Sequence, residues 1–320
     1  MGIFSKLRQE YSASLKSMDT EETIDLLFYR PIGFVWAKIG EALGITPNAI
    51  TIASIFIGIA GGVLLYYFEP GKIWLNYLGI LLIIVANSLD SADGQLARMT
   101  HQYSRLGRIL DGMSGDLWFI TIYIAICLRE TASSEFFIQF PWLIWIIAVA
   151  AGWFHAKQAY TADYYRQFHL YFLKGEEGSE LDSCDKLDEQ LSQLSWKTNF
   201  REWLPLWFYR HYTANQELLT PSMQRLRRTI KEHFGDTVAQ VPQQFRDDFR
   251  HRSKPLMKYT NWLTFNVRVI VLFITVVTKW PWFYFAFELV ALNALLFYTI
   301  SRHERICRQL TQKIQDGDYQ

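Results

Sequence analysis

The stretch that decides the fold is ITIASIFIGIAGGVLLYYF, Ile50 to Phe68, which contains no charged residue. A helix that crosses the hydrocarbon core of a bilayer needs about 20 mostly apolar residues. Lipid offers no hydrogen bonds to the backbone, so such a stretch has to satisfy its own polar groups as a helix. The stretch therefore predicts the first span of a helical membrane protein.

Five further stretches approach the same length and complete an all-α bundle of six predicted transmembrane helices. They cover residues 73–89, 117–128, 136–154, 262–277 and 282–300. The third is short unless its polar beginning, Leu110 to Asp116, also lies within the depth of the membrane. The composition agrees, because half of the 320 residues are hydrophobic, 16% are aromatic and only 20% are charged.

Composition and charge exclude several classes of protein. The apolar content excludes a disordered chain, and three well-separated cysteines give no disulfide framework and no metal-ligand spacing. With 32 Lys+Arg against 31 Asp+Glu, the net charge of +1 provides no basic field for a nucleic acid. We therefore expect a membrane-embedded protein with no nucleic-acid partner.

The basic residues near the span ends predict the orientation. They gather at positions 6–38, 98–108 and 302–313, which lie on one side if there are six spans. We therefore expect a multi-pass protein of the cell membrane with both termini in the cytoplasm. The predicted regions are an N-terminal interfacial part (1–47), helices 1–4 (48–160), a cytoplasmic insertion (161–260), helices 5–6 (261–303) and a cytoplasmic tail (304–320).

Two of these regions carry further structural signals. Pro31 to Leu43 has the pattern of an amphipathic interfacial helix that ends at Gly44, and Thr46-Pro47 is a typical helix start. The insertion has nearly balanced charges and an apolar group around Trp203 to Phe208. We expect it to form short helices, some on the membrane surface or capping the bundle; the alternative is a mobile linker.

The stretch Asn87 to Trp118, NSLDSADGQLARMTHQYSRLGRILDGMSGDLW, carries the chemistry. Asp90 and Asp93 end the second span, and Asp111 and Asp116 begin the third. A carboxylate at membrane depth costs about 2.5–3.5 kcal/mol on insertion scales and is functional by default. Four such groups would be satisfied by divalent cations such as Mg²⁺, which also bind substrate phosphates. The alternative is that they are ordinary helix-end acids, neutralised by neighbouring arginines.

Small and basic residues accompany these acids. Gly94, Ala97 and Gly107 remove side-chain bulk, so that a ligand or a helix can approach the backbone closely. Arg98 follows Asp93 by about one turn, where its guanidinium is placed to bind a diphosphate.

The pattern Asp90-x2-Asp93-Gly94-x2-Ala97-Arg98-x8-Gly107-x3-Asp111 resembles the signature of the CDP-alcohol phosphatidyltransferase family. The resemblance covers roughly residues 30–160 and 261–305. It implies that Asp90, Asp93 and Asp111 bind two Mg²⁺ or Mn²⁺ ions and that Arg98 holds the diphosphate of a CDP-linked donor. Gly94, Ala97 and Gly107 would then make room for the cytidine nucleotide.

The sequence departs from that signature at its last position. The family has a fourth Asp, a metal ligand and general base, four residues after the third, where this chain has Gly115 and then Asp116. Five residues turn a regular helix by about 500°, which leaves Asp116 about 140° away from Asp111. We predict a π-bulge in this helix, which would return Asp116 to the site as a metal ligand and, beside Asp111, as the catalytic base.

The acceptor is predicted from basic residues facing the same cavity. Arg268 in the fifth span either contacts a phosphate or pairs with an acid, and Lys157 either binds an anion or extends to the membrane interface. If both bind an anion, CDP-diacylglycerol is the donor, and the acceptor is a small alcohol such as inositol phosphate or glycerol phosphate. The alternative is transfer from a CDP-amino-alcohol such as CDP-ethanolamine to diacylglycerol or ceramide.

Hypotheses of another class are a cation-coupled transporter and a non-catalytic member of the family. The transporter leaves the spacing of Gly94, Ala97 and Gly107 unexplained, and either one predicts no release of CMP. A homodimer is compatible with the sequence, which contains no feature that requires one.

Overall fold

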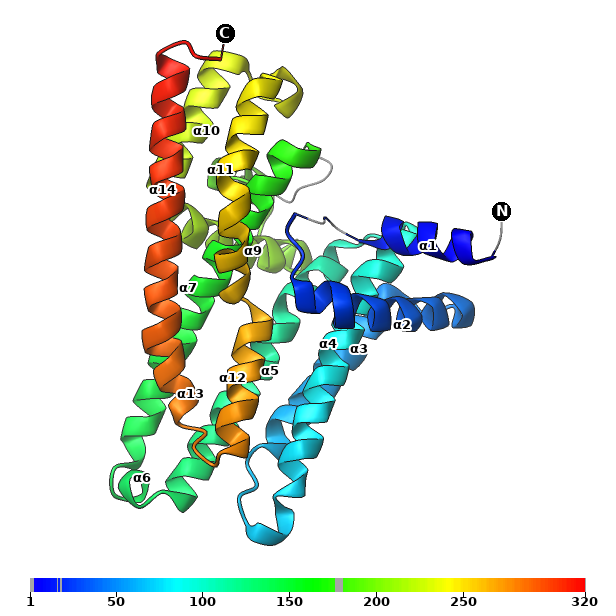
Figure 1. The fold of residues 1–320 in the computed structure, drawn as a ribbon, viewed down its shortest axis with the longest axis vertical. Coiled ribbons are helices and arrows are strands. Elements are labelled where there is room, and N and C mark those ends of the chain that lie inside the picture. The colour runs from blue at the N-terminus through cyan, green and yellow to red at the C-terminus, as the bar shows by residue number, and fades with distance from the viewer. Residues whose placement is uncertain (1–2, 16, 18, 176–180, 320) are drawn as a thin grey trace. The chain divides into compact units, whose positions relative to one another are not determined.

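The computed structural model describes residues 3–15, 17, 19–175 and 181–319, and the regular elements of these residues are all helical (Figure 1). They divide into two compact units: Met1–Gly152 with Phe265–Leu289, and Trp153–Thr264 with Val290–Gln320. We call these unit 1 and unit 2 and describe each by itself.

Unit 1 holds most of the apolar helices. Its elements are α1 (Ile3–Ser14), the π-helix η1 (Asp25–Tyr29), α2 (Arg30–Leu43), α3 (Pro47–Leu64), the 3-10 turn η2 (Pro70–Lys72), α4 (Trp74–Thr100), α5 (Arg105–Ser133), α6 (Glu135–Gln139), α12 (Phe265–Val277) and α13 (Phe283–Ala286). The unit also contains the first part of α7 (Pro141–Lys174) and the first part of the π-helix η5 (Phe287–Leu292).

Unit 2 contains the rest of α7 and the polar part of the chain. Its other helices are α8 (Cys184–Ser192), α9 (Phe200–Leu218), α10 (Pro221–Phe234), the 3-10 turn η4 (Val238–Gln240), α11 (Gln243–Trp262) and α14 (Asn293–Gln315). The region predicted as an insertion contains the second part of α7 and several further helices. Aromatic rings of α7 and α11, among them Phe168, Phe172, Phe245 and Phe249, form its core together with Leu310 of α14.

Among the residues that the structure describes, five helical stretches are long and apolar enough to cross a membrane. They are Pro47–Leu64, Pro70–Thr100, Leu110–Ser133, Gln243–Val277 and Phe283–Gln315. The third begins at Leu110, so the polar start of the expected third span belongs to the same helical stretch. The chain is therefore a multi-pass helical membrane protein.

The expected fourth span, residues 136–154, is not among the five stretches. The helix breaks at Phe140, where α6 has ended, and α7 begins at Pro141. Pro141 has no N–H to continue the preceding helix and suits a first helical position. The apolar run of α7 is consequently shorter than predicted, and His155 and Lys157 follow it directly.

Glycines set the distances between α3, α4 and α5. A Cβ on Gly61 would lie 2.8 Å from the carbonyl oxygen of Gly79, and one on Gly58 would lie 2.3 Å from the ring of Trp118. Any larger residue would force these helices apart. Close contact of this kind is the usual way in which helices associate in lipid, where no hydrophobic effect drives them together.

The helix starts and stops predicted before the first span are confirmed. α2 ends at Leu43, and Gly44 follows in the left-handed conformation with φ of 68°. The Thr46 side chain then caps α3 by accepting a hydrogen bond of 3.3 Å from the backbone N–H of Ala49, with Pro47 in the first turn. α2 packs closely on α4 at Gly33, where an added Cβ would lie 2.5 Å from the Gln95 side chain.

Candidate functional site

Three of the predicted acids come together at one end of the α4–α5 pair. Asp90 and Asp93 lie on α4 and Asp111 on α5, and one carboxylate oxygen from each lies within 4.8 Å of the others. Asp93 is only 4% exposed, Asp90 is half-buried, and Asp111 is exposed. The cluster is thus buried at one side and open at the other.

Hydroxyl groups of neighbouring helices hold two of these carboxylates. Thr51 of α3 donates a short hydrogen bond to Asp93, and the same hydroxyl lies 3.1 Å from the carbonyl oxygen of Pro47. Ser114 of α5 donates to Asp90 over 2.6 Å and lies 2.8 Å from the carbonyl oxygen of Asp111. Sequence reasoning missed both residues; Ser114, one turn after Asp111, could have been found from helical spacing.

The predicted π-bulge in α5 is wrong. α5 is a regular α-helix from Arg105 to Ser133, so Asp116 lies about 140° around the axis from Asp111. Asp116 is exposed, and the carboxylate cluster found among the described residues consists of Asp90, Asp93 and Asp111 without it. Gly112 and Gly115 permit a bulge but do not impose one, and Ser114 takes the helix face toward Asp90.

The basic and small residues of the motif lie on α4 and at the start of α5. The Arg98 side chain donates to the carbonyl oxygen of Ser14 over 2.5 Å, and its terminal nitrogens lie beside Gly94, 3.4 and 3.5 Å from where a Cβ would stand. Ala97 is half-buried on the same helix. A Cβ on Gly107 would meet the side chain of Asn48 at 2.5 Å, so this glycine lets the start of α5 approach α3.

The chemistry of the cluster is that of a site for hard cations. Three carboxylates supply oxygen ligands only, and their mutual distance allows one ion to bridge them. Thr51 and Ser114 orient two of the carboxylates, as outer-shell groups do around metal ligands.

Residues 44–167 match the sequence profile of the CDP-alcohol phosphatidyltransferase family. The chain contains a CDP-alcohol phosphatidyltransferase domain. Cholinephosphotransferase 1 of Danio rerio is 29% identical over 92 residues, which represent 27% of this chain and 24% of that protein. The chain thus matches about a quarter of the length of this curated relative.

The two basic residues predicted to bind the acceptor lie in different units. Arg268 of α12, in unit 1, is 1% exposed and makes a short ion pair with Glu288, which is fully buried. Tyr123 and Tyr284 donate hydrogen bonds to the other oxygen of Glu288. Of the two roles predicted for Arg268, pairing with an acid is the one observed.

Lys157 lies on α7 in unit 2. Its ammonium group donates a short hydrogen bond to the side chain of Asn215 and lies 5.1 Å from the centre of the Trp153 ring. Both partners are neutral, and neither is an anion. The phosphorylated acceptor inferred from Arg268 and Lys157 therefore gains no support from the contacts of these two residues.

Proposed function

We propose that this protein transfers the phospho-amino-alcohol part of a CDP-linked amino alcohol to the hydroxyl of a lipid such as diacylglycerol and releases CMP. The observation that carries the proposal is the cluster of Asp90, Asp93 and Asp111 within the matched domain. Carboxylates that face one another at the end of two apolar helices can bind divalent ions, which would hold a diphosphate while one of its P–O bonds breaks.

In this reaction the lipid oxygen attacks the β-phosphorus of the donor, the bond between that phosphorus and the bridging oxygen breaks, and CMP leaves. Asp90, Asp93 and Asp111 would hold two Mg²⁺ or Mn²⁺ ions, which, when bound, neutralise the diphosphate. Asp111, the exposed member of the cluster, would accept the proton of the attacking hydroxyl. Thr51 and Ser114 would keep Asp93 and Asp90 oriented.

The other residues of the motif would bind the donor. Arg98 donates to Ser14 through Nε, so its two terminal nitrogens would contact the diphosphate. A planar guanidinium commonly binds phosphate through two parallel hydrogen bonds. Gly94 and Ala97 would give the nucleotide room beside α4. Gly107 would act indirectly, because it sets how closely the start of α5 approaches Asn48.

Two observations favour a CDP-amino-alcohol over CDP-diacylglycerol as the donor. The curated relative, which is 29% identical over 92 residues, is a cholinephosphotransferase. Arg268, the main reason to expect a phosphorylated acceptor, is engaged with Glu288 inside the apolar core. An uncharged lipid hydroxyl needs no buried cation to receive it.

We also propose that the apolar part of α7, residues 141–154, forms a further, short span. Together with the five longer stretches it would make six, and the even number would return both termini to the same side of the membrane. The basic residues at 6–38, 98–108 and 302–313 would then all be cytoplasmic. Reaction of labels at residues 6 and 313 with an impermeant reagent, in vesicles of known sidedness, tests this.

The test of the reaction is CMP release by the purified full chain in detergent with Mg²⁺. CDP-ethanolamine or CDP-choline with diacylglycerol should release CMP, and Asp93→Asn should abolish the release. Release of CMP only from CDP-diacylglycerol with glycerol phosphate or inositol phosphate would contradict the proposal, because the lipid would then be part of the donor and not the acceptor. Cation-coupled flux without CMP release from any donor would show that the protein is a transporter and does not catalyse the proposed reaction.

A further inference from the structure

The helix α9 in unit 2 presents a partly exposed stripe, three of whose five residues are apolar, that the proposed reaction does not use. Leu204, Phe208, His211, Asn215 and Leu218 recur at intervals of three and four residues, so they share one face of the helix. Phe208 is 61% exposed and Leu218 is 74% exposed. We call these five residues the α9 stripe.

The connection before α9 and the first turn of α9 add more exposed rings. Trp196 is 60% exposed and Phe200 is 52% exposed, and they alternate with the exposed cations Lys197 and Arg201. Exposed tryptophan and phenylalanine are unusual in a solvated linker, and the pairing of rings with cations is typical of segments at a membrane interface.

Contacts within unit 2 fix the level at which α9 crosses α7. Lys157 of α7 binds Asn215, the ring of Tyr160 lies 4.5 Å from that of Tyr212, and Asp163 accepts a hydrogen bond of 2.8 Å from the Tyr212 hydroxyl. α9 therefore passes the segment 157–163 of α7.

The same segment of α7 lies beside the end of the apolar run of α14. Gln158 of α7 donates to Asn293 of α14 over 2.8 Å, and seven residues later Tyr165 stacks on His303 at 3.8 Å. Positions 157–163 of α7 thus correspond to about 293–300 of α14. There α14 exposes Phe297 (63%) and Tyr298 (43%), within the apolar stretch Phe283–Gln315. α9 crosses at the level where this stretch turns polar.

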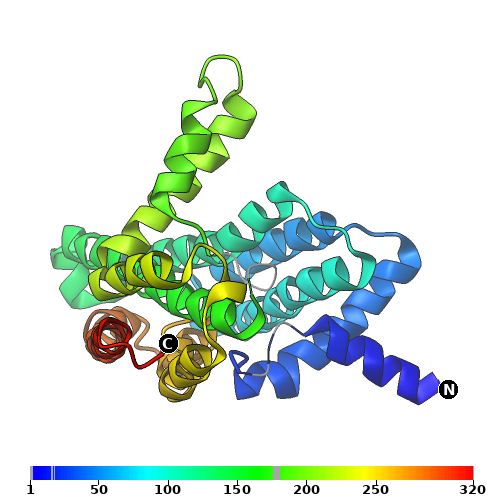
Figure 2. The ribbon, with the colours of Figure 1, turned by 90° about the horizontal axis from the view of Figure 1, so that it is seen from above.

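The α9 stripe is on the side of α9 nearer the apolar end of α7. Asn215, a member of the stripe, contacts Lys157, whereas Tyr212 and Gln216, about 60° and 100° around the helix from Asn215, contact Asp163 and the carbonyl oxygen of Tyr160. Because α7 becomes more apolar from Asp163 back toward Trp153, the α9 stripe faces the apolar end of α7. In Figure 2, which looks along α14, the α8–α9 hairpin lies across that direction.

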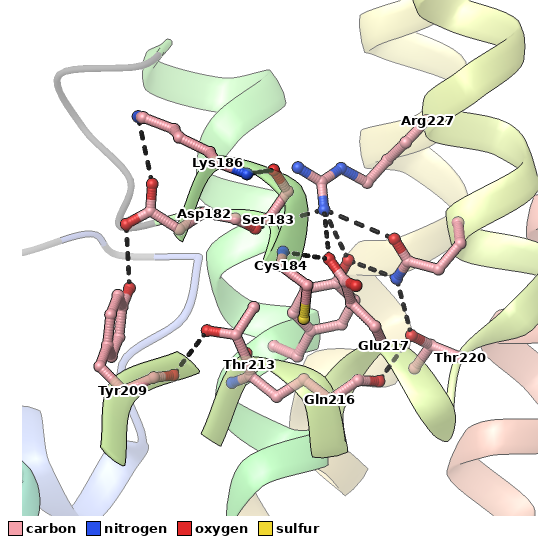
Figure 3. Close-up of polar contacts among 12 residues, drawn as sticks. Asp182, Ser183, Cys184, Lys186, Tyr209, Thr213, Gln216, Glu217, Thr220 and Arg227 are labelled. Carbon is pink, nitrogen blue, oxygen red and sulfur yellow. Dashed lines mark hydrogen bonds and ion pairs between the residues drawn. The ribbon is translucent and has the colours of Figure 1, made fainter. Parts of the chain in front are cut away.

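The hairpin is fixed to its own unit by a polar network. Arg210 forms two hydrogen bonds of 2.8 Å with Asp188 of α8, and Tyr209 donates to Asp182 over 3.2 Å. Glu217 accepts a hydrogen bond of 3.2 Å from the backbone N–H of Cys184 and lies 3.6 Å from Arg227 of α10 (Figure 3). These contacts all lie off the α9 stripe, so they hold the helix without covering its apolar face.

We infer that the α9 stripe and the rings of Trp196 and Phe200 bind the surface of the lipid bilayer, with the hairpin lying flat at the headgroup level. The occupant is lipid because the stripe faces the apolar end of α7, which we propose as a short span, at the level of the exposed rings of α14. Lys197 and Arg201 would meet the lipid phosphates beside those rings. The inference depends on the membrane helices and is independent of the proposed reaction.

The test is the lipid contact of a label at position 208 in the full chain, reconstituted in phosphatidylcholine–phosphatidylglycerol vesicles. Phe208→Cys is made with Cys184→Ser and labelled with an environment-sensitive fluorophore; the remaining Cys127 and Cys307 are buried. Glu232→Cys on α10, an exposed polar position, is the aqueous control, and Phe297→Cys on α14 is the lipid control. Lipids with a nitroxide near the headgroup and aqueous iodide are the two quenchers.

The label at 208 should lose at least about twofold more fluorescence to the nitroxide lipid than the label at 232, and less to iodide. Quenching at 208 equal to that at 232 would overturn the inference, since the stripe would then face water. Protection from both quenchers would overturn it as well, because a protein surface would then cover the stripe. Neither result bears on CMP release, so the proposed reaction is judged separately.

Discussion

Unit 1 buries carboxylates at two places among its apolar helices, and it satisfies them in different ways. Asp90 and Asp93 accept hydrogen bonds from the hydroxyls of Ser114 and Thr51 and lie beside a third carboxylate. Glu288 instead receives the guanidinium of Arg268 and two tyrosine hydroxyls. A neutral hydroxyl orients a charge without cancelling it, whereas a guanidinium cancels it.

The difference distinguishes the candidate cation site from a structural contact. The Arg268–Glu288 pair is closed: both side chains are at most 1% exposed, and their charges compensate inside the core around Tyr123 and Tyr284. The aspartate cluster keeps like charges together and opens to the surface at Asp111. Such an arrangement suits an external cation, so the two places should respond differently to substitution and to divalent ions.

The largest effect should follow from removing a charge from the cluster. Asp93→Asn keeps the size of the side chain but removes a cation ligand, so CMP release should fall by about 10²-fold or more. The rate of CMP release in saturating Mg²⁺ measures this, and Glu288→Gln is the comparison, because it removes a carboxylate from the closed site. Turnover by Asp93→Asn close to that of the parent would mean that the cluster is not the reaction centre.

The closed pair should show its importance in stability. Arg268→Met leaves Glu288 buried without its cation and should lower the free energy of unfolding by about 3–5 kcal/mol. Replacing both residues with apolar ones of similar size should cost much less, because no charge is then stranded. Denaturant unfolding in detergent of both single variants and of the double variant measures the coupling. Equal losses for single and double variants would contradict the assignment of a closed pair.

A smaller effect should follow from removing a hydroxyl that orients the cluster. Thr51→Val deletes the hydrogen bond to Asp93 and should raise the Mg²⁺ concentration for half-maximal CMP release by about tenfold. Thr51→Ser keeps the hydroxyl and serves as the matched control. Superimposable Mg²⁺ curves for Thr51→Val and the parent would show that Asp93 is oriented without Thr51.

The smallest effect is expected at Asp116. This side chain is exposed and lies about 140° around α5 from Asp111, so Asp116→Asn should change CMP release by less than about threefold. The measurement is the same CMP assay, run beside Asp111→Asn, which should be severely impaired. If Asp116→Asn lowered the rate of CMP release as much as Asp111→Asn, Asp116 would again be the candidate for the catalytic base.

Much of the fold could be read from local patterns. The apolar stretch from Ile50, the stop at Gly44 and the cap at Thr46 are each properties of a few adjacent residues, and the helices begin and end near the predicted positions. The expected fourth span was predicted too long because hydrophobicity alone does not register that Pro141 starts a new helix. The start and stop signals before the first span thus followed from the sequence, whereas α4, α5, α7 and α14 extend beyond the predicted spans, because a helix can continue past the end of an apolar run.

The candidate site was only partly predictable. Asp90, Asp93 and Asp111 were singled out by spacing, but spacing along α5 could not decide between a regular helix and one with a π-bulge. π-helical turns do occur in this chain, at Asp25–Tyr29 and at Phe287–Leu292, where Glu288 pairs with Arg268. Their position depends on contacts between helices, which leave no local pattern.

The sequence by itself determined that the chain is helical and membrane-embedded, and that Asp90 and Asp93 end its second span, because both follow from the composition of continuous segments. Only the tertiary structure decided which partner each buried charge has. Thr51 is 42 residues from Asp93, and Arg268 is 20 residues from Glu288. Those pairings depend on how closely the helices approach, and glycines such as Gly58 and Gly61 set that distance through contacts with helices elsewhere in the chain.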